Sequence, residues 1–313
     1  MTNKRINNFI EQGSITKSKY FEGWYYKQVN SALNKSVSFI FGYSTNTKNP
    51  HSFIQIIQSN PLQTAYLSFP LDSFKSENEG YRIDNTWFSP TKLILDINHE
   101  TITCKGELTF SDSNELSSKN PYMPNIMGPF TYIPNMECNH GVVSMSHTIN
   151  GSIQLNDETW EFKNDKGYTE KDWGTSFPKR YIWIQGNHFK NANTSFMLSL
   201  AHIPFIGFSF EGLIAQLNTD TKSYRFATYT ASYRSDLIKN DHGFIMTINR
   251  GFYKLIVDVI MDHRISLVSP KDGLMQNSIK EGLGGTVHLK LYHFNQLILE
   301  DTSTNCGIEI EGY

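Results

Sequence analysis

The sequence has no apolar run long enough to cross a membrane and no long stretch of charge of one sign. A membrane-spanning helix needs roughly 20 apolar residues, so we expect no span of that kind. The 28 basic and 30 acidic side chains give a formal net charge of −2. This balance argues against nucleic acid or an anionic membrane surface as the main partner of the protein.

Cysteine is also scarce. The three residues, Cys104, Cys138 and Cys306, lie far apart and form no C-x-x-C pair. This pattern supports neither a disulfide framework nor a zinc ribbon. Residues 1–10 carry basic side chains but no continuous apolar stretch and no small-residue cleavage site, which argues against a secretory signal. We therefore expect a reducing, cytoplasmic location.

The familiar cofactor motifs are missing as well. Residues 281–286 are rich in glycine, but they precede a predicted strand and open no helix, so they predict no dinucleotide site. The ten histidines are scattered, and a close pair such as His140 and His147 is separated by an odd number of residues. On one strand their rings would point to opposite faces. We expect no cofactor and no metal site built from neighbouring residues, while a site assembled from distant strands stays open.

Short segments with alternating apolar and polar residues fill most of the chain. The clearest are residues 92–97, 253–259 and 287–292, each with apolar side chains on one face and polar or charged ones on the other. This alternation is typical of half-buried strands. The breaks between strands are short and consist of Asn, Asp, Gly, Ser and Pro, with no helical stretch among them. We predict an all-β fold of antiparallel barrels or sandwiches.

The length of 313 residues exceeds one ordinary domain. With domains of about 150 residues as the norm, we expect one domain at residues 1–160 and a second at residues 161–313. A faint internal similarity agrees with this division. Residues 20–28 and residues 180–186 each form an aromatic strand with a tryptophan near its start, as expected if two related barrels follow one another.

One connection differs from the others. Residues 120–136 contain four prolines, which preclude a regular central strand, yet they are too rich in aromatic residues and methionine for a solvated linker. We expect this segment to pack on an apolar surface. It either seals a domain interface or forms a wall over a ligand cavity, as long loops often do.

Residues 167–189 concentrate two carboxylates with basic and aromatic side chains, turn glycines and a proline. A sheet does not need so many functional groups to hold itself together. We interpret this stretch as the start of the second half of the chain, where polar groups stand at the mouth of an apolar cavity.

Three stretches carry a resemblance to a known family. Residues 21–27, 136–147 and 167–178, followed by Trp183, Gln185 and Asn187, together resemble the tocopherol cyclase family. The match covers most of the chain in the right order. It implies a pair of packed lipocalin-like β-barrels, as in carotenoid 1,2-hydratase-type proteins. It also implies the reaction of the plant members, which close a chroman ring on a prenylated quinol.

A reaction of this kind protonates a trisubstituted alkene and lets an oxygen nucleophile capture the tertiary cation. The acid must be a carboxylic acid that stays neutral, which burial or a second nearby carboxylate favours. Glu170 and Asp172 are two residues apart, so on an extended segment they share one face and could share one proton. The alternative is a surface ion cluster in which Glu170, Lys171 and Asp172 pair with Lys179 and Arg180.

Further candidates lie in the same motifs. Glu22 could be a second acid or orient the substrate, and its alternative role is a salt bridge. Glu137 and His140 stand where the proline-rich segment meets a strand, so they could position a hydroxyl or act as its base. We rank Asp172 and Glu170 first among the catalytic candidates.

Aromatic faces would stabilise the cation by roughly 0.5–2 kcal/mol each. The candidates for this role are Trp24, Tyr25, Trp173 and Trp183. Each could instead be an ordinary packing residue at the end of a barrel. With Glu137, Gln185 and Asn187 from the family motif, they form the predicted substrate-binding set.

The leading hypothesis is a cofactor-independent cyclase or hydratase that acts on a prenylated quinol or polyene lipid. One alternative is a non-catalytic, lipocalin-like carrier of a hydrophobic small molecule. Another is a pericyclase-like enzyme for a polyketide, which would use cavity shape instead of a strong acid. In each case the partner is a hydrophobic small molecule, which could bring the protein transiently to a membrane surface.

Overall fold

The computed structural model describes residues 4, 7–116, 120–134, 136–205, 208–261 and 263–313. Strands account for most of them, and the only helical elements among the described residues are three 3-10 turns. The prediction of an all-β fold is confirmed. In the described part of the chain, no helix has the length and apolar character that a membrane crossing requires.

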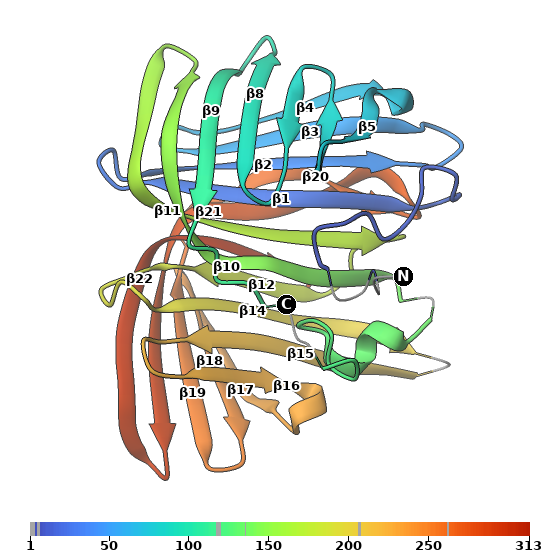
Figure 1. Ribbon diagram of the computed structural model, residues 1–313. Helices are drawn as coiled ribbons and strands as arrows, with labels where there is room; N and C mark the ends of the chain where they lie inside the picture. Colours follow the sequence, from blue (N-terminus) through green and yellow to red (C-terminus); the bar gives the residue numbers. More distant parts are fainter. Residues whose placement is uncertain (1–3, 5–6, 117–119, 135, 206–207, 262) are drawn as a thin grey trace. The chain divides into compact units, whose positions relative to one another are not determined.

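The chain divides into two units (Figure 1). Unit 1 comprises Met1–Phe177 and Leu267–Ser278, and unit 2 comprises Pro178–Ser266 and Ile279–Tyr313. The expected boundary between residues 160 and 161 lies inside strand β11 (Glu158–Gly174), which is paired along nearly its whole length with strands of unit 1. The stretch from residue 167 to 174 therefore completes unit 1 and does not open unit 2.

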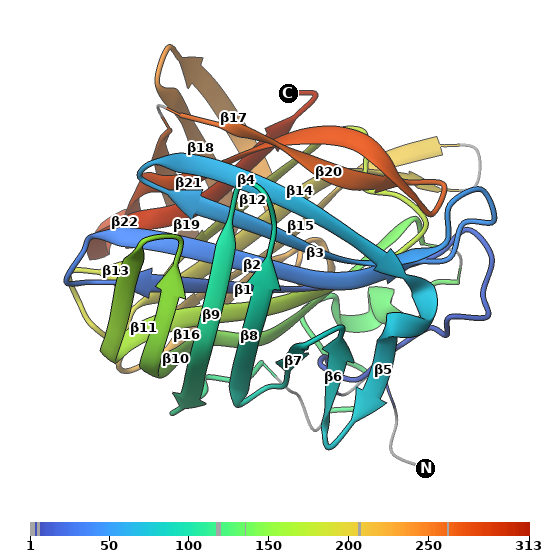
Figure 2. The ribbon, with the colours of Figure 1, turned by 90° about the horizontal axis from the view of Figure 1, so that it is seen from above.

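The sheet of unit 1 is antiparallel, with the strand order β4-β3-β2-β1-β11-β10-β9-β8-β7-β6-β5 (Figure 2). Its strands are β1 (Phe21–Asn30), β2 (Lys35–Ser44), β3 (His51–Ser59), β4 (Leu62–Pro70), β5 (Phe74–Glu77), β6 (Gly80–Ile83), β7 (Thr86–Phe88), β8 (Lys92–Asn98), β9 (Thr103–Ser111), β10 (Cys138–Leu155) and β11. The sheet curves around one apolar core. Within β8 the predicted alternation holds, because Leu93, Leu95 and Ile97 are buried in that core.

Unit 2 has an antiparallel sheet of its own, with the order β16-β15-β14-β12-β22-β21-β19-β18-β17. The strands are β12 (Tyr181–Gly186), β13 (His188–Phe189), β14 (Ser195–Phe205), β15 (Phe208–Asn218), β16 (Ser223–Ala227), β17 (Tyr233–Asn240), β18 (Gly243–Arg250), β19 (Tyr253–Ile260), β21 (Leu274–His293) and β22 (Gln296–Glu311). The alternation predicted for β19 and β21 holds, since Leu255 and Val257 pack with Leu289 and Leu291 in a second core.

The two aromatic strands that suggested an internal similarity occupy comparable positions. Strand β1 lies between β2 and β11 in unit 1, and β12 lies between β14 and β22 in unit 2. Both are buried at every residue. Both faces of these inner strands are covered, so there is no solvent-exposed face that would require polar residues at alternate positions, and neither segment alternates.

A hairpin from the second half of the sequence belongs to unit 1. It consists of β20 (Ile265–Lys271) and the start of β21. The Asn46 side-chain amide donates to the Asp272 carbonyl at 2.7 Å, and the Val268 amide donates to Oε1 of Gln55 at 2.9 Å. Gln55 is 2% exposed, so this hairpin satisfies a polar group that would otherwise be buried without a partner.

Candidate functional site

Strand β11 presents a different set of side chains on each of its faces. It lies between β1 and β10, with Tyr25 of β1 opposite Glu170 and His140 of β10 opposite Asp172. Because side chains alternate along a strand, Tyr168, Glu170 and Asp172 share one face, and Lys171 points to the other. Both faces are buried near residue 170.

On the first face, His140 lies between the two carboxylates that we ranked first. Its Nδ1 atom is 2.8 Å from Oδ1 of Asp172, and its Nε2 atom is 3.4 Å from Oε2 of Glu170. The Tyr168 hydroxyl donates a hydrogen bond to the same oxygen of Glu170. The imidazole thus lies between the two carboxylates, hydrogen-bonded to Asp172 and in ion-pair contact with Glu170, whereas their spacing had suggested a directly shared proton. We refer to Tyr168, His140, Glu170 and Asp172 as the His140 cluster.

Electrostatics within the His140 cluster favour a charged imidazole. His140 is 8% exposed and Glu170 is 4% exposed. Burial alone lowers the pKa of His140, but the charges of Glu170 and Asp172 and the hydrogen bond to Asp172 outweigh it and raise this pKa to about 9. Burial next to Glu170 raises the pKa of the Tyr168 hydroxyl well above its ordinary value. Tyr168 therefore stays protonated and acts as a donor.

The proline-rich connection packs onto this face, as the sequence predicted. Ile126 and Met127 are buried, and the Met127 sulfur accepts a hydrogen bond from the His140 amide at 3.1 Å. The short helix η2 (Gly128–Tyr132) follows directly. The connection thus packs against the start of β10 at His140.

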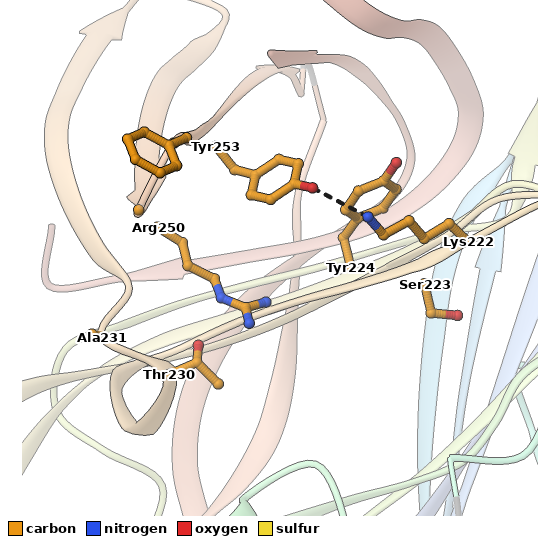
Figure 3. A pocket seen from close by; sticks show the side chains of 9 residues that line it. Lys222, Ser223, Tyr224, Thr230, Ala231, Arg250 and Tyr253 are labelled. Carbon is orange, nitrogen blue, oxygen red and sulfur yellow. Dashed lines mark hydrogen bonds between the residues drawn. The ribbon is translucent and has the colours of Figure 1, made fainter. Parts of the chain in front are cut away.

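Unit 2 contains a hollow whose lining residues differ from the predicted site residues. It measures about 540 Å³ and is lined by segments 222–224, 230–231 and 250–253 (Figure 3). None of the predicted catalytic or substrate-binding residues belongs to this lining.

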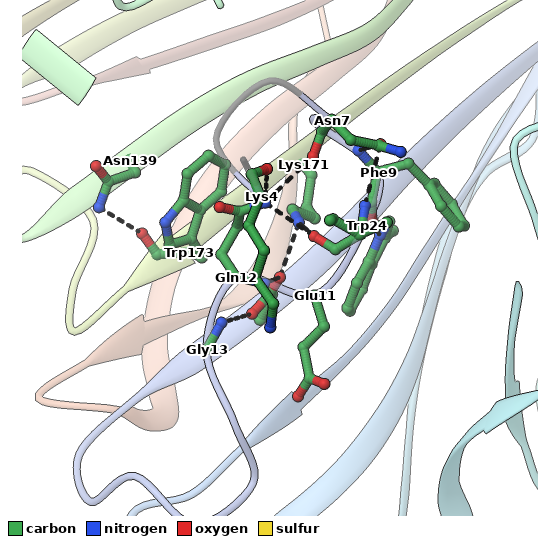
Figure 4. Close-up of polar contacts among 12 residues, drawn as sticks. Lys4, Asn7, Phe9, Glu11, Gln12, Gly13, Trp24, Asn139, Lys171 and Trp173 are labelled. Carbon is green, nitrogen blue, oxygen red and sulfur yellow. Dashed lines mark hydrogen bonds and ion pairs between the residues drawn. The ribbon is translucent and has the colours of Figure 1, made fainter. Parts of the chain in front are cut away.

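The opposite face of β11 carries a buried ion pair (Figure 4). Nζ of Lys171 is 2.8 Å from Oε1 of Glu22, and both side chains are 0% exposed. The carboxylate of Glu22 also accepts hydrogen bonds from the Tyr20 hydroxyl at 2.8 Å and from the Gln12 and Gly13 amides at 2.8 and 2.9 Å. Glu22 is therefore the salt-bridge partner of Lys171, which is the alternative role that we considered for it.

Two of the predicted cation-binding tryptophans surround this lysine. Nζ of Lys171 lies 5.1 Å from the ring centroid of Trp24 and 5.0 Å from that of Trp173. Trp24 also stacks with Phe74 in the core of unit 1, and its Nε1 atom donates to the Phe9 carbonyl at 2.7 Å. In the structure both rings lie beside the ammonium group of Lys171 and stabilise it.

The remaining predicted residues have separate positions. Tyr25 is 7% exposed and accepts a hydrogen bond from the Ser38 hydroxyl at 2.9 Å. Glu137 has an exposed side chain, and its carbonyl accepts from the Thr175 amide at 2.8 Å. The predicted residues of the second half are Trp183, Gln185 and Asn187, which are buried in unit 2.

Comparison with known proteins identifies the family. A family model described as tocopherol cyclase-like matches residues 51–312. The chain belongs to the tocopherol cyclase-like family. The family prediction, made from short motifs, is confirmed.

A rice relative (Oryza sativa subsp. japonica) named "Probable tocopherol cyclase, chloroplastic" is 25% identical over 174 residues. That alignment covers 52% of this chain but only 37% of the rice protein. The tocopherol cyclase-like chain thus spans little more than a third of the curated relative that it matches.

Two solved structures resemble the fold. CghA in complex with Sch210972 has a TM-score of 0.62 at 10% identity, and the match covers 93% of this chain and 88% of CghA. Kievitone hydratase from Nectria haematococca has a TM-score of 0.52 at 10% identity, with coverage of 92% and 88%. At this identity the likeness concerns the fold, and it confirms the lipocalin-like double-barrel class that we predicted for a tocopherol cyclase-like chain.

Sequence reasoning missed three residues that the structure places on or near strand β11. Tyr168 lies two residues before Glu170, and this spacing alone predicts that both side chains share one face of the strand. Lys171 was seen only as a surface charge, because its partner Glu22 is far away in the sequence. Met127 was visible only as part of an unusual connection.

The His140 cluster also contains donor atoms that suit a metal ion. Among the described residues, His140, Glu170 and Asp172 are the one set whose ligand atoms lie within 4.8 Å of one another. They come from the consecutive strands β10 and β11, and the register of this strand pair brings His140 opposite Asp172. A metal needs a neutral imidazole, and the raised pKa of His140 favours a proton instead.

Proposed function

We propose that this tocopherol cyclase-like protein is an enzyme that cyclises or hydrates a prenylated quinol or polyene lipid by acid catalysis. One observation carries the proposal: His140 lies in a buried position between Glu170 and Asp172, within reach of both. Strongly perturbed groups that are coupled to one another are typical of sites that move protons.

The His140 cluster can hold one mobile proton. With a protonated imidazole and two carboxylates it has one net negative charge, and this charge does not change when the proton moves from Nε2 of His140 to Oε2 of Glu170. The transfer converts an ion pair into a neutral imidazole and a neutral carboxylic acid. An apolar substrate that excludes water favours the neutral pair, because charges are costly in a low dielectric.

In the proposed reaction, Glu170 is the acid. Its carboxylic proton adds to the less substituted carbon of a trisubstituted alkene, and the electron pair of the double bond forms the new C–H bond. The tertiary cation is then captured by a phenol oxygen or by water. The proton of that oxygen returns to the Glu170 carboxylate or to His140, so the cluster is restored and no redox partner is needed.

The two other members of the cluster have supporting roles. Asp172 binds Nδ1 of His140 and thereby directs Nε2 toward Glu170. The Tyr168 hydroxyl holds one carboxylate oxygen of Glu170. Sequence reasoning ranked Asp172 and Glu170 first together. The side chain of Asp172 is 24% exposed against 5% for Glu170, so Glu170 is the better candidate for a neutral acid.

The test is turnover of a panel of prenyl quinols and polyene lipids in the presence of a metal chelator and without nucleotide. We expect Glu170→Gln to lower kcat by about a hundredfold or more and to leave lipid binding intact. Glu161→Gln is the matched control, because Glu161 lies on the same strand with a side chain that is 62% exposed. Unchanged rates in Glu170→Gln would overturn the assignment, and binding without conversion across the panel would identify a carrier.

A further inference from the structure

Two hairpin turns meet at one end of the sheet of unit 2. One contains Phe252, between β18 and β19, and the other contains Phe294, between β21 and β22. The Phe294 amide donates to the Phe252 carbonyl at 3.1 Å, and the two rings stack with their centroids 4.1 Å apart. Both side chains are nevertheless mostly in solvent, with exposures of 66% and 62%. We call this pair the phenylalanine tip.

Two further exposed apolar side chains follow the phenylalanine tip in the sequence. Leu297 and Ile298, at the start of β22, are each 43% exposed. Isolated exposed apolar residues are common on soluble proteins, but a contiguous group marks an interaction site. The backbone hydrogen bond between the turns holds the two rings in place, so their exposure is a feature of the fold.

Cationic side chains line the hollow beside the phenylalanine tip (Figure 3). Nζ of Lys222 donates to the Tyr253 hydroxyl at 3.1 Å and lies 5.0 Å from the Tyr224 ring. Arg250 lines the same hollow, with one guanidinium nitrogen bound to the Arg225 carbonyl at 2.6 Å. Neither cation forms an ion pair with a carboxylate of the described residues.

We propose that this end of unit 2 is a docking surface for a bilayer that contains anionic lipids. The phenylalanine tip enters the boundary between headgroups and acyl chains, and Lys222 and Arg250 bind lipid phosphates from the hollow. Phenylalanine beside basic residues is the combination that interfacial membrane anchors use. Lys222 and Arg250 supply the charge complementarity locally, although the whole chain has a net charge of −2.

The proposal does not depend on the His140 cluster, because its residues all belong to unit 2 and the cluster belongs to unit 1. A second copy of this chain is the competing occupant of the same surface. The two cations favour the bilayer. If two copies associated through this surface, Lys222 and Arg250 of one copy would face the apolar tip of the other, where their charges have no partner.

The test measures binding of the full chain to vesicles of phosphatidylcholine alone and of phosphatidylcholine mixed with phosphatidylglycerol. We expect Phe252→Ser/Phe294→Ser to weaken the partition constant for both kinds of vesicle by at least about tenfold. We expect Lys222→Gln/Arg250→Gln to weaken binding to the anionic vesicles by about fivefold or more, to change binding to neutral vesicles little, and to remove most of its salt dependence.

The matched control is Ile238→Ser/Lys239→Gln. It removes an apolar residue that is 63% exposed and an exposed lysine, both on β17 toward the opposite end of the sheet. This control should bind like the unmodified chain. All variants change exposed or solvent-facing groups, and equal thermal unfolding of each verifies the fold. Vesicle binding that the Phe252→Ser/Phe294→Ser change leaves intact would overturn the proposal, as would a dimer that this change disperses.

Discussion

At the scale of single residues, the protonation of His140 is the property with the clearest consequence. The imidazole contacts two carboxylates, and its pKa of about 9 lies above the ordinary value of 6.5. The folded protein therefore binds a proton more tightly than the unfolded chain does. This contribution to stability is complete below pH 6.5 and is lost as the pH rises through about 9.

We predict that the free energy of unfolding of unit 1 decreases between pH 6.5 and pH 9. A shift from 6.5 to about 9 corresponds to roughly 3 kcal/mol for one buried group. The measurement is urea unfolding across this range for the unmodified chain and for His140→Gln, in which the dependence should be much smaller. An equal pH dependence in both proteins would contradict the assignment of the proton to His140.

At the scale of the element, β11 joins two kinds of chemistry. The face with Glu170 and Asp172 meets His140 on β10, and the face with Lys171 meets Glu22 on β1. The N-terminal residues complete the second face, because Gln12 and Gly13 donate their amides to Glu22. A single strand thus carries a candidate proton relay on one side and a structural ion pair on the other.

We predict that Lys171→Met destabilises unit 1 by about 3–5 kcal/mol, because Glu22 is left as an unpaired charge in the core. Lys163→Met is the matched control on the same strand. Its ion pair with Glu161 is solvent-exposed, so this substitution should change the free energy of unfolding little.

The double variant Glu22→Gln/Lys171→Met should be less destabilised than the sum of the single changes, as urea unfolding can determine. Additive effects of the two substitutions would show that the buried pair is not coupled.

At the scale of the whole molecule, the two units are built from interleaved parts of the chain. Residues 267–278 belong to unit 1, although unit 2 surrounds them in the sequence. Gly273, in this hairpin, lies directly against the backbone of Lys19 and Tyr20 in the N-terminal part of unit 1. Its φ is +71°, and a Cβ atom there would lie 2.2 Å from the carbonyl carbon of Lys19.

We predict that Gly273→Ala weakens the contact of this hairpin with the rest of unit 1. Gly251→Ala is the matched control, because its φ of +53° imposes a similar backbone cost but nothing lies within 4 Å of the added atom. Gly273→Ala should cost about 1–3 kcal/mol more than the control. Hydrogen exchange should also become faster at the Val268 and Asp272 amides. Equal costs for the two substitutions would argue against tight packing at Gly273.

The sequence by itself determined the class of fold and the family. Period-2 alternation in segments such as β8 and β19 is a local property, because neighbouring side chains on a strand point to opposite faces. It was enough to predict an all-β protein, and the motifs around residue 170 were enough to predict the family. The same rule places Glu170 and Asp172 on one face from their spacing alone.

Only the tertiary structure decided which groups meet. The register of β10 against β11 brings His140 between Glu170 and Asp172, and the register of β1 against β11 brings Glu22 to Lys171. In both cases the register of two paired strands decides which side chains lie beside each other, and a shift of one residue would turn each of them to the other face. The sequence also placed the boundary of unit 1 inside β11, where strand pairing shows that the unit continues to Phe177.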